Sequence, residues 1–461
     1  MAYNAASSLA GVLDRIPTDF RHRVTTVMVF DDHSDDSTYL VGLGYRQVAS
    51  DLPLEVIRHP RNLGYGGNQK AGYRRAVELG LDIVVLLHAD GQYAPELLPE
   101  IVAPLERGEC DAVFGSRMLV AGAAREGGMP LYKYVGNKVL TRFENAALGT
   151  QLSEFHSGYR AYRVAALEQL DLESYSDGFD FDTEIIIGLI DAGMTIRELP
   201  IPTYYGDEIC YVNGLRYARD VTADVIRYRL EKAGLGSSGR LDDRDYALKD
   251  SLDGSHRAIL DWMDRPSARV LDLGCSSGLL SQELRALGHY VVGVDVITHP
   301  EVKERTDEFY EADLDHGLPA GLPSDFDVVI CGDVLEHVRR PEALLPELAA
   351  VVGPRGHVIA SVPNFAHWYP RLRTAAGRFD YDQRGILDRD HVRFFTRHSF
   401  RRLCDRSGWE VVRSRSTGVP LELLTGSRLA RAAGNVERVA RTAWPTMFAY
   451  QFLFELAPIQ R

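Results

Sequence analysis

The stretch ARVLDLGCSSGLLSQELRALG (268–288) decides the fold of the second half of the chain. An apolar run, a glycine turn and an amphipathic segment follow one another, which predicts a strand, a tight turn and a helix. The next apolar run, YVVGVDV (290–296), contains Asp295 about 20 residues beyond the turn, where a carboxylate can hold ribose hydroxyls. The stretch therefore predicts a nucleotide-like cofactor bound at the carboxyl ends of parallel strands.

Three further segments extend this pattern: EADLD (311–315), FDVVICGDVLEHV (326–338) and HVIASVPN (357–364). With the turn they resemble class I S-adenosylmethionine-dependent methyltransferases; the alternative is a nicotinamide-binding Rossmann unit. The resemblance implies a Rossmann-like domain over residues 246–461 with S-adenosyl-L-methionine (SAM) as its cofactor. It assigns SAM binding to residues of the turn and of later strand ends: Asp272, Gly274, Ser276, Gly278, Asp295, Asp313, Leu314, Cys331 and Gly332.

Histidines supply candidate bases for methyl transfer to a hydroxyl oxygen, because a neutral imidazole accepts a proton near neutral pH. His337 follows a predicted strand, and His391 lies in LDRDHVRFFT (387–396), which is expected to cover the substrate. His367 and Glu336 are weaker candidates. A buried structural role is the alternative for the histidines, and O-methylation rests on the histidines alone.

The first half alternates β-branched runs with amphipathic stretches, which is typical of a parallel α/β sheet. The runs are VTTVMVF (24–30), LEVIRH (54–59), DIVVLL (82–87), DAVFGS (111–116) and TIRELPI (195–201). Acidic clusters follow two of them, DDHSDDS (31–37) and HADGQY (88–93), and should meet at one edge of the sheet. Their oxygens suit ribose hydroxyls and a Mg²⁺ or Mn²⁺ ion that neutralises a diphosphate. A glycine-rich turn (61–77) adds Lys70 as a nearby cation.

The order of the motifs in this half resembles glycosyltransferase family 2, in particular its dolichol-phosphate-mannose-synthase-like branch. The motifs are AYN (2–4), DDHSDDS (31–37), NLGYGGN (62–68), HADGQY (88–93), GSR (115–117) and SGYRAYR (157–163). The resemblance implies a GT-A-like domain over residues 1–233 and nucleotide-sugar contacts at Tyr3, Asn4, Asp31, Asp32, Arg117 and Arg160. A surface or structural salt bridge is the alternative for the two arginines. It assigns the metal and diphosphate to His88, Asp90 and Gln92, with His88 in place of the family's usual first Asp.

The same resemblance implies an inverting direct displacement at the anomeric carbon. A phosphate acceptor needs no general base, whereas a hydroxyl acceptor does. Asp182 and Glu208 are the leading base candidates, and solvated surface acids are the alternative. In this family AYN follows the central first strand, so we expect that strand to be missing and the natural reading frame to begin about ten residues upstream.

The composition is that of an acidic globular protein: 461 residues, 45% hydrophobic and 25% charged, with a net charge of −13. The charge disfavours nucleic acid as a partner. Five dispersed cysteines form no zinc or disulfide pattern, and no apolar run has membrane-spanning length. A cytoplasmic location is expected, with peripheral contact at the inner membrane face as an option.

A Gly/Ser-rich stretch predicts a linker over residues 234–245 between domains 1–233 and 246–461. Near the C-terminus, residues 427–443 predict a basic helix, and the alternation in 444–458 predicts a last antiparallel strand. A solvated face is the default role for the basic helix, and a membrane or partner surface is the alternative.

Both halves together predict a bifunctional enzyme with a nucleotide-sugar donor, SAM and a divalent metal. The acceptor would be a glycan, a glycolipid or a polyprenyl phosphate, with methylation in the same glycan pathway. The main alternative is a methyltransferase whose first half binds a glycan or nucleotide-sugar without catalysis. A third hypothesis is an active glycosyltransferase whose cofactor domain only scaffolds.

Overall fold

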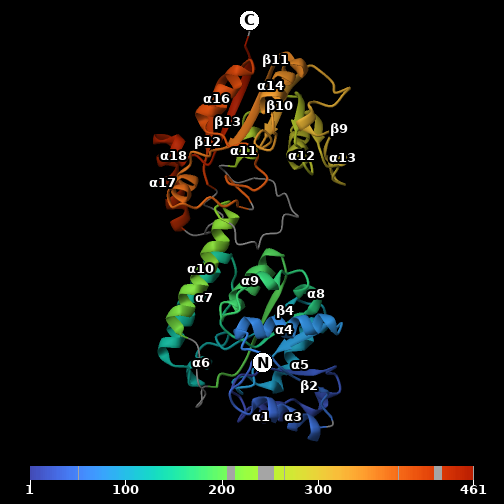
Figure 1. The fold of residues 1–461 in the computed structure, drawn as a ribbon, viewed down its shortest axis with the longest axis vertical. Helices are drawn as coiled ribbons and strands as arrows, with labels where there is room; N and C mark the ends of the chain where they lie inside the picture. Colours follow the sequence, from blue (N-terminus) through green and yellow to red (C-terminus); the bar gives the residue numbers. More distant parts are fainter. Residues whose placement is uncertain are drawn as a thin grey trace. The chain divides into compact units, whose positions relative to one another are not determined.

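The chain folds into two units, Met1–Tyr228 and Arg229–Arg461, each with its own sheets and core (Figure 1). The computed structural model describes residues 1–49, 51–204, 213–236, 254–263, 265–382, 384–419 and 428–459. The division falls inside helix α10 (Gly214–Lys232). Two residues of the expected linker, Gly234 and Leu235, belong to the second unit; there the Tyr450 hydroxyl donates to the Gly234 carbonyl and Leu235 is buried. Residues 237–245 of that linker lie outside the described residues.

Unit 1 contains two sheets, a parallel pair β1–β2 and a mixed sheet with the order β3-β5-β4-β6. The strands are β1 (Val27–Asp31), β2 (Leu54–Arg58), β3 (Ile83–Leu86), β4 (Ala112–Ser116), β5 (Arg160–Arg163) and β6 (Ile196–Pro200). Met1 and Ala2 lie between the sheets: the Ala2 N–H donates to the Phe30 carbonyl, and the Ala89 N–H donates to the Met1 carbonyl, both at 2.9 Å.

Each of the five apolar runs predicted in the first half corresponds to one strand of unit 1, and β1 extends one residue beyond its run, to Asp31. Strand β5 was not predicted, and it pairs antiparallel with both β3 and β4. The sheet is therefore mixed, whereas the sequence indicated a purely parallel one. β5 reads RAYR, with an arginine at each end, so it lacks the apolar run that marks the equally short β3 (IVVL).

The helices of unit 1 cover these sheets and complete the core. They are α1 (Leu9–Asp14), α2 (Thr18–Arg21), α3 (Thr38–Val48), α4 (Gly64–Glu78), α5 (Leu98–Glu106), α6 (Ala123–Glu126), α7 (Leu131–Leu148), α8 (Val164–Leu167), α9 (Phe181–Asp191) and α10, with the short 3-10 turns η1 (Pro95–Leu97) and η2 (Leu172–Ser174). Leu9 and Leu13 of α1 and Ile101 and Leu105 of α5 pack into one buried cluster with strand residues such as Val113.

Unit 2 is built on one seven-stranded sheet with the order β12-β13-β11-β10-β7-β8-β9. The strands are β7 (Arg269–Leu273), β8 (Tyr290–Asp295), β9 (Glu308–Glu311), β10 (Phe326–Gly332), β11 (Val352–Pro363), β12 (Trp409–Thr417) and β13 (Gln451–Pro458). β13 runs antiparallel to β11 and β12, whereas β11, β10, β7, β8 and β9 are mutually parallel. The predicted antiparallel last strand is thus confirmed.

Helices cover both faces of this sheet, as expected for a Rossmann-like fold (Figure 1). The helices are α11 (Ser255–Leu260), α12 (Leu279–Ala286), α13 (Val302–Arg305), α14 (Pro341–Val351), α15 (Trp368–Ala375), α16 (Arg397–Arg406), α17 (Arg428–Ala443) and α18 (Pro445–Phe448), with the 3-10 turn η3 (Leu314–His316). Neighbouring residues of one strand alternate between the faces: Val270 packs with Leu284 of α12, and Leu271 packs in the cluster that holds Leu344 of α14. This alternation fixes the register of the sheet.

Within the described part of the chain, no helix combines the length and the hydropathy needed to cross a membrane. The predicted basic helix is present as α17.

We expect Trp409→Phe to lower the free energy of unfolding of unit 2 by about 1–3 kcal/mol. The Trp409 side chain is fully buried, and its indole N–H donates to the Leu345 carbonyl at 2.8 Å. Urea denaturation followed by circular dichroism measures the change. Trp444→Phe is the control, because Trp444 is 54% exposed and its replacement should change the stability little. Equal losses in the two variants would contradict the prediction.

Candidate active sites

The turn after β7 brings its backbone to the carboxyl edge of the unit 2 sheet. Gly274, Ser276 and Gly278 have φ values of +67°, +49° and +81°, a region that favours glycine. A Cβ on Gly274 would lie 2.5 Å from Cγ2 of Val334, so the turn leaves no room for a side chain there. Asp295, at the end of β8, accepts the Ser276 N–H at 2.7 Å and ties the turn to the next strand.

The other predicted SAM contacts lie at the ends of neighbouring strands. Cys331 and Gly332 end β10, while Asp313 and Leu314 follow β9. Because β10, β7, β8 and β9 are adjacent and parallel, these residues share one edge of the sheet with the turn. The Asp313 carboxylate accepts the Asp315 N–H and begins η3. The strand order therefore brings the predicted SAM residues together.

Two buried groups beneath this edge have shifted pKa values. Burial raises the pKa of Asp272 to about 7, and repulsion from Asp295 adds to the shift, although the Ser281 hydroxyl donates to the Asp272 carboxylate at 2.6 Å. Burial also raises the pKa of the Cys275 thiol, which fits a packing role rather than a nucleophilic one.

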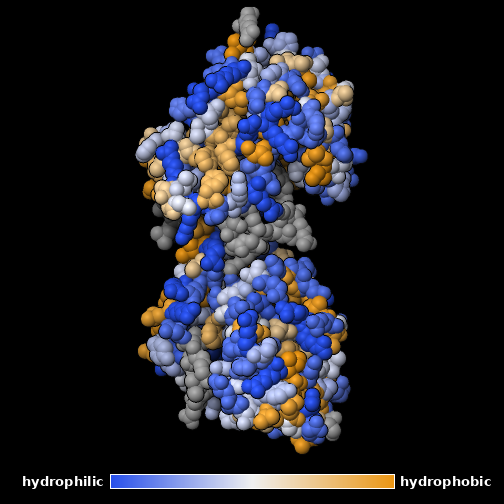
Figure 2. Space-filling view, viewed as in Figure 1, coloured by the Kyte–Doolittle hydropathy of each residue, from blue (hydrophilic) through white to orange (hydrophobic). Residues whose placement is uncertain are grey.

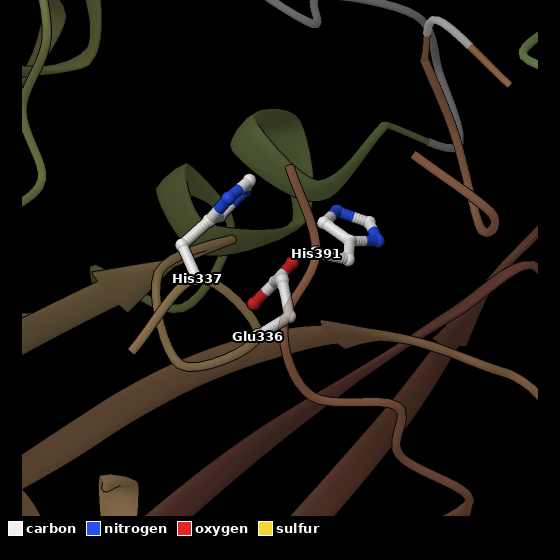
Figure 3. Close-up of side chains that lie close together, drawn as sticks. All are labelled: Glu336, His337 and His391. Atoms are coloured by element: carbon white, nitrogen blue, oxygen red, sulfur yellow. The ribbon is translucent and has the colours of Figure 1, made fainter. Parts of the chain in front are cut away.

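Three predicted side chains, Glu336, His337 and His391, converge at the carboxyl end of β10 (Figure 3). The two imidazole centroids are 4.8 Å apart, and Glu336 and His391 are buried whereas His337 is exposed. The Glu336 carbonyl accepts the N–H groups of Val392 and Arg393, each at 2.9 Å, so the two chain segments are joined through their backbones. The sequence predicted His337 and His391 independently, and the structure brings them together.

His367 lies elsewhere in unit 2 and has a structural role. It is fully buried, burial lowers its pKa to about 4, and its side chain accepts the Tyr369 N–H at the start of α15. The Nδ1 contact makes His367 the N-cap of α15.

In unit 1, the predicted nucleotide-sugar residues at the end of β1 and in the AYN motif are held by neighbouring segments of the chain. Asp31 is fully buried and lies 3.3 Å from Nε of Arg58. Asp32 accepts the N–H groups of Leu63 and Gly64 at 2.7 and 3.1 Å, where α4 begins. Burial raises the pKa of Asp32, and those two hydrogen bonds oppose the shift. Asn4 accepts the Asp35 N–H at 3.0 Å, so the AYN and DDHSDDS motifs form one loop cluster. Tyr3, beside Asn4, is 38% exposed.

His88 and Asp90 follow β3, as predicted. The His88 imidazole packs against Tyr65 and Tyr93, and burial lowers its pKa, so it is neutral at pH 7 and able to bind a metal. Asp90 is exposed and accepts the Gln92 N–H at 3.0 Å.

Asp182 is the centre of a buried hydrogen-bond network. Its carboxylate accepts from the Tyr65 hydroxyl at 2.9 Å and from the Gln69 amide at 3.1 Å, and it lies 3.6 Å from the Arg160 guanidinium. Arg160 is itself buried and donates to the carbonyls of Ser157, Phe155 and Asp182. The structure therefore places both residues inside the protein framework, and Arg160 in particular faces backbone carbonyls.

The two remaining predicted cations are also paired. The Lys70 ammonium donates to the Tyr175 carbonyl at 2.8 Å and lies 2.7 Å from the Asp177 carboxylate. Arg117 follows β4 and forms an ion pair with the buried Glu154, which also accepts the Arg117 N–H at 2.7 Å. Burial by itself would raise the pKa of Glu154, but the ion pair and hydrogen bonds outweigh it and hold that pKa below its usual value.

Comparison with known proteins assigns a family to each unit. The family model "Glycosyl transferase family 2" matches residues 1–171, and the family model "Methyltransferase domain" matches residues 243–414. The undecaprenyl-phosphate mannosyltransferase of Micrococcus luteus is 30% identical over 200 residues, which cover 43% of this chain and 79% of that protein. The first unit belongs to glycosyltransferase family 2. The second unit is a SAM-dependent methyltransferase domain.

Two further similarities concern the methyltransferase unit. The ubiquinone biosynthesis O-methyltransferase of Burkholderia thailandensis is 34% identical over 116 residues, which cover 23% of this chain and about half (50%) of that enzyme. The magnesium protoporphyrin IX methyltransferase of Synechocystis, solved with bound S-adenosylhomocysteine, is 19% identical, with a TM-score of 0.31. That comparison covers 44% of this chain and 81% of the solved one.

Sequence reasoning missed several residues of the glycosyltransferase unit. Tyr65 and Gln69 hold Asp182, and only their place in the glycine-rich turn and the helix after it points to them. An acidic group of Asp180, Glu184 and Asp224 was also missed, because Asp224 is distant in sequence. Burial and repulsion from Asp180 raise the pKa of Asp224 to about 7. Glu208, a predicted base, lies outside the described residues.

We expect Gly274→Ala to weaken the binding of S-adenosylhomocysteine at least tenfold, because its Cβ would meet Val334 in a backbone region unfavourable to alanine. Ser276→Gly is the matched change in the same turn. It removes a side chain from a positive φ, so it should preserve binding and stability. Calorimetry of both variants checks the prediction, and equal affinities would contradict it.

The raised pKa of Asp272 predicts a pH-dependent stability. The folded unit holds this proton up to about pH 7, whereas the unfolded chain releases it near pH 4. The contribution of Asp272 to the free energy of unfolding should therefore fall as the pH rises from about 4 to about 7. The difference in free energy of unfolding between Asp272→Asn and the wild type should therefore favour the variant more at pH 8 than at pH 5. Thermal denaturation at both pH values measures this difference, and a difference that does not change with pH would refute it.

Proposed function

We propose that unit 1 transfers a sugar from a nucleotide-sugar to a polyprenyl phosphate, and that unit 2 methylates a hydroxyl oxygen in the same glycan pathway. We choose a phosphate acceptor because of the hydrogen bonds that the Asp182 carboxylate already accepts. A hydroxyl acceptor needs a base, but Asp182 is buried and already accepts from Tyr65 and Gln69. A phosphate acceptor needs none, and the name of the Micrococcus relative supports this acceptor class.

In the proposed transfer, an acceptor phosphate oxygen attacks the anomeric carbon of the donor. The bond from that carbon to the diphosphate oxygen breaks, the nucleoside diphosphate leaves with the electron pair, and the configuration inverts. His88, Asp90 and Gln92 would hold a divalent metal, and the neutral imidazole suits Mn²⁺ better than Mg²⁺. Such an ion stabilises the charge of the leaving diphosphate. Arg117, fixed by Glu154, adds a positive charge after β4.

Exposed apolar side chains on unit 1 support a lipid acceptor. Leu131, Val135 and Val139 follow one another at four-residue intervals on α7 and are 62%, 50% and 62% exposed. Figure 2 shows apolar patches along the edge of this unit where α7 and α10 lie. A stripe of this kind suits contact with a membrane surface, where a polyprenyl phosphate resides.

The proposed methylation uses the carboxyl edge of the unit 2 sheet. SAM supplies an electrophilic methyl group when bound. The Gly274–Gly278 turn and Asp295 would hold the cofactor, and the exposed His337 would face the acceptor oxygen. The Burkholderia O-methyltransferase supports an oxygen acceptor over other atoms.

Asp90→Asn should reduce sugar transfer to a short-chain polyprenyl phosphate at least a hundredfold, because it removes the exposed carboxylate expected to hold the metal. A panel of labelled nucleotide-sugars with Mn²⁺ measures transfer, and mass spectrometry detects a methylated product when SAM is added. Asp82→Asn is the matched control, because Asp82 precedes β3 whereas Asp90 follows it.

Full transfer by Asp90→Asn would refute this assignment of the donor site. Binding of a nucleotide-sugar with no turnover by the wild type would favour the alternative, a non-catalytic binding unit. A sugar product that is never methylated would refute the shared pathway.

A further inference from the structure

The cluster of Glu336, His337 and His391 has a feature that a general base does not require. One ligand atom from each side chain lies within 4.8 Å of the other two, and the three side chains come from two chain segments (Figure 3). A single imidazole suffices to accept a proton from a hydroxyl. The convergence of two imidazoles and a carboxylate therefore calls for another explanation.

The hydrogen bonds of the two imidazoles fix their tautomers. Nδ1 of His337 lies 3.1 Å from the Asp390 carbonyl, and Nδ1 of His391 lies 3.3 Å from the Ile386 carbonyl. A carbonyl oxygen only accepts, so each Nδ1 carries a hydrogen, and Nε2 is the atom of each ring that can bind a metal ion. This arrangement, with Nδ1–H donated to a backbone carbonyl, is the one that metal-binding histidines adopt.

We propose that Glu336, His337 and His391 bind a divalent transition-metal ion in the methyltransferase unit. Two imidazole nitrogens and one carboxylate oxygen suit Zn²⁺, Mn²⁺ or Fe²⁺ rather than Ca²⁺, which prefers oxygen ligands. Three protein ligands leave positions open, as in catalytic rather than structural sites. The exposure of His337 gives an acceptor access to them.

The location of the site suggests what the open positions bind. Glu336 and His337 follow Cys331 and Gly332, the predicted cofactor contacts at the end of β10. Resting on the proposed function, the ion binds the hydroxyl oxygen of the methyl acceptor and favours loss of its proton to solvent. That oxygen then forms a bond to the methyl carbon while the carbon–sulfur bond of SAM breaks, and sulfur keeps the electron pair.

Titration of the metal-free full chain with Co²⁺ tests the site, in an Asp90→Asn background that removes the one carboxylate among the expected metal ligands of unit 1. We expect an absorbing Co²⁺ complex and two solvent-exchangeable, paramagnetically shifted proton signals from the two Nδ1–H groups. His391→Ala and His337→Ala should each weaken Co²⁺ binding at least about tenfold and remove one signal. His398→Ala, an exposed histidine of the same unit, should change neither.

Equal Co²⁺ affinity in His391→Ala and in the Asp90→Asn background would overturn the proposal. Binding of S-adenosylhomocysteine by each variant reports whether unit 2 is folded, and Glu336→Gln gives a second, more conservative change. Because the titration needs no methyl acceptor, its result is separate from the proposed function. Metal binding without any methyl transfer would refute O-methylation alone, and methyl transfer without metal binding would refute the ion alone.

Discussion

The left-handed backbone between β7 and α12 is the constraint on which the methyltransferase unit depends. Gly274, Ser276 and Gly278 all take positive φ values, so the chain turns sharply at the carboxyl edge of the sheet. The close approach of Val334 to Gly274 also sets the path of the loop that follows β10. Asp295 fixes the turn from the other side through the Ser276 N–H. A cofactor site and the Glu336 cluster are thus positioned by one turn and its two neighbouring strands.

The sequence predicted the parts of the fold that repeat a regular pattern. The five apolar runs of the first half, the turn after β7 and the antiparallel β13 are all present. Strand β5 escaped prediction because its sequence, RAYR, is not an apolar run, and its antiparallel partners β3 and β4 are distant in sequence. Periodicity reports local structure, whereas this pairing is set by tertiary packing.

The candidate sites were predictable to different degrees for a physical reason. Strand ends of a parallel sheet meet at one edge, so the predicted SAM residues and His337 could be grouped from the strand order alone. The partners of a charged side chain cannot be deduced this way. Asp182, Arg160 and Lys70 looked available for ligands, yet their contacts to Tyr65, Phe155 and Tyr175 place them in the framework of unit 1. The ion pair with Glu154 likewise ties one side of the Arg117 guanidinium to the framework.

These contacts lead to a chemical contrast between the two units. In unit 1 the buried carboxylate Asp182 accepts from two neutral donors and lies close to a cation, so its negative charge is already balanced within the protein. In unit 2 each Nδ1–H of His337 and His391 is directed to a backbone carbonyl, and both imidazoles lie close to the Glu336 carboxylate. A site of the first kind orients substrates that bring their own charge, such as a phosphate acceptor. A site of the second kind attracts a cation or a proton, which a neutral hydroxyl acceptor needs before its oxygen becomes a nucleophile.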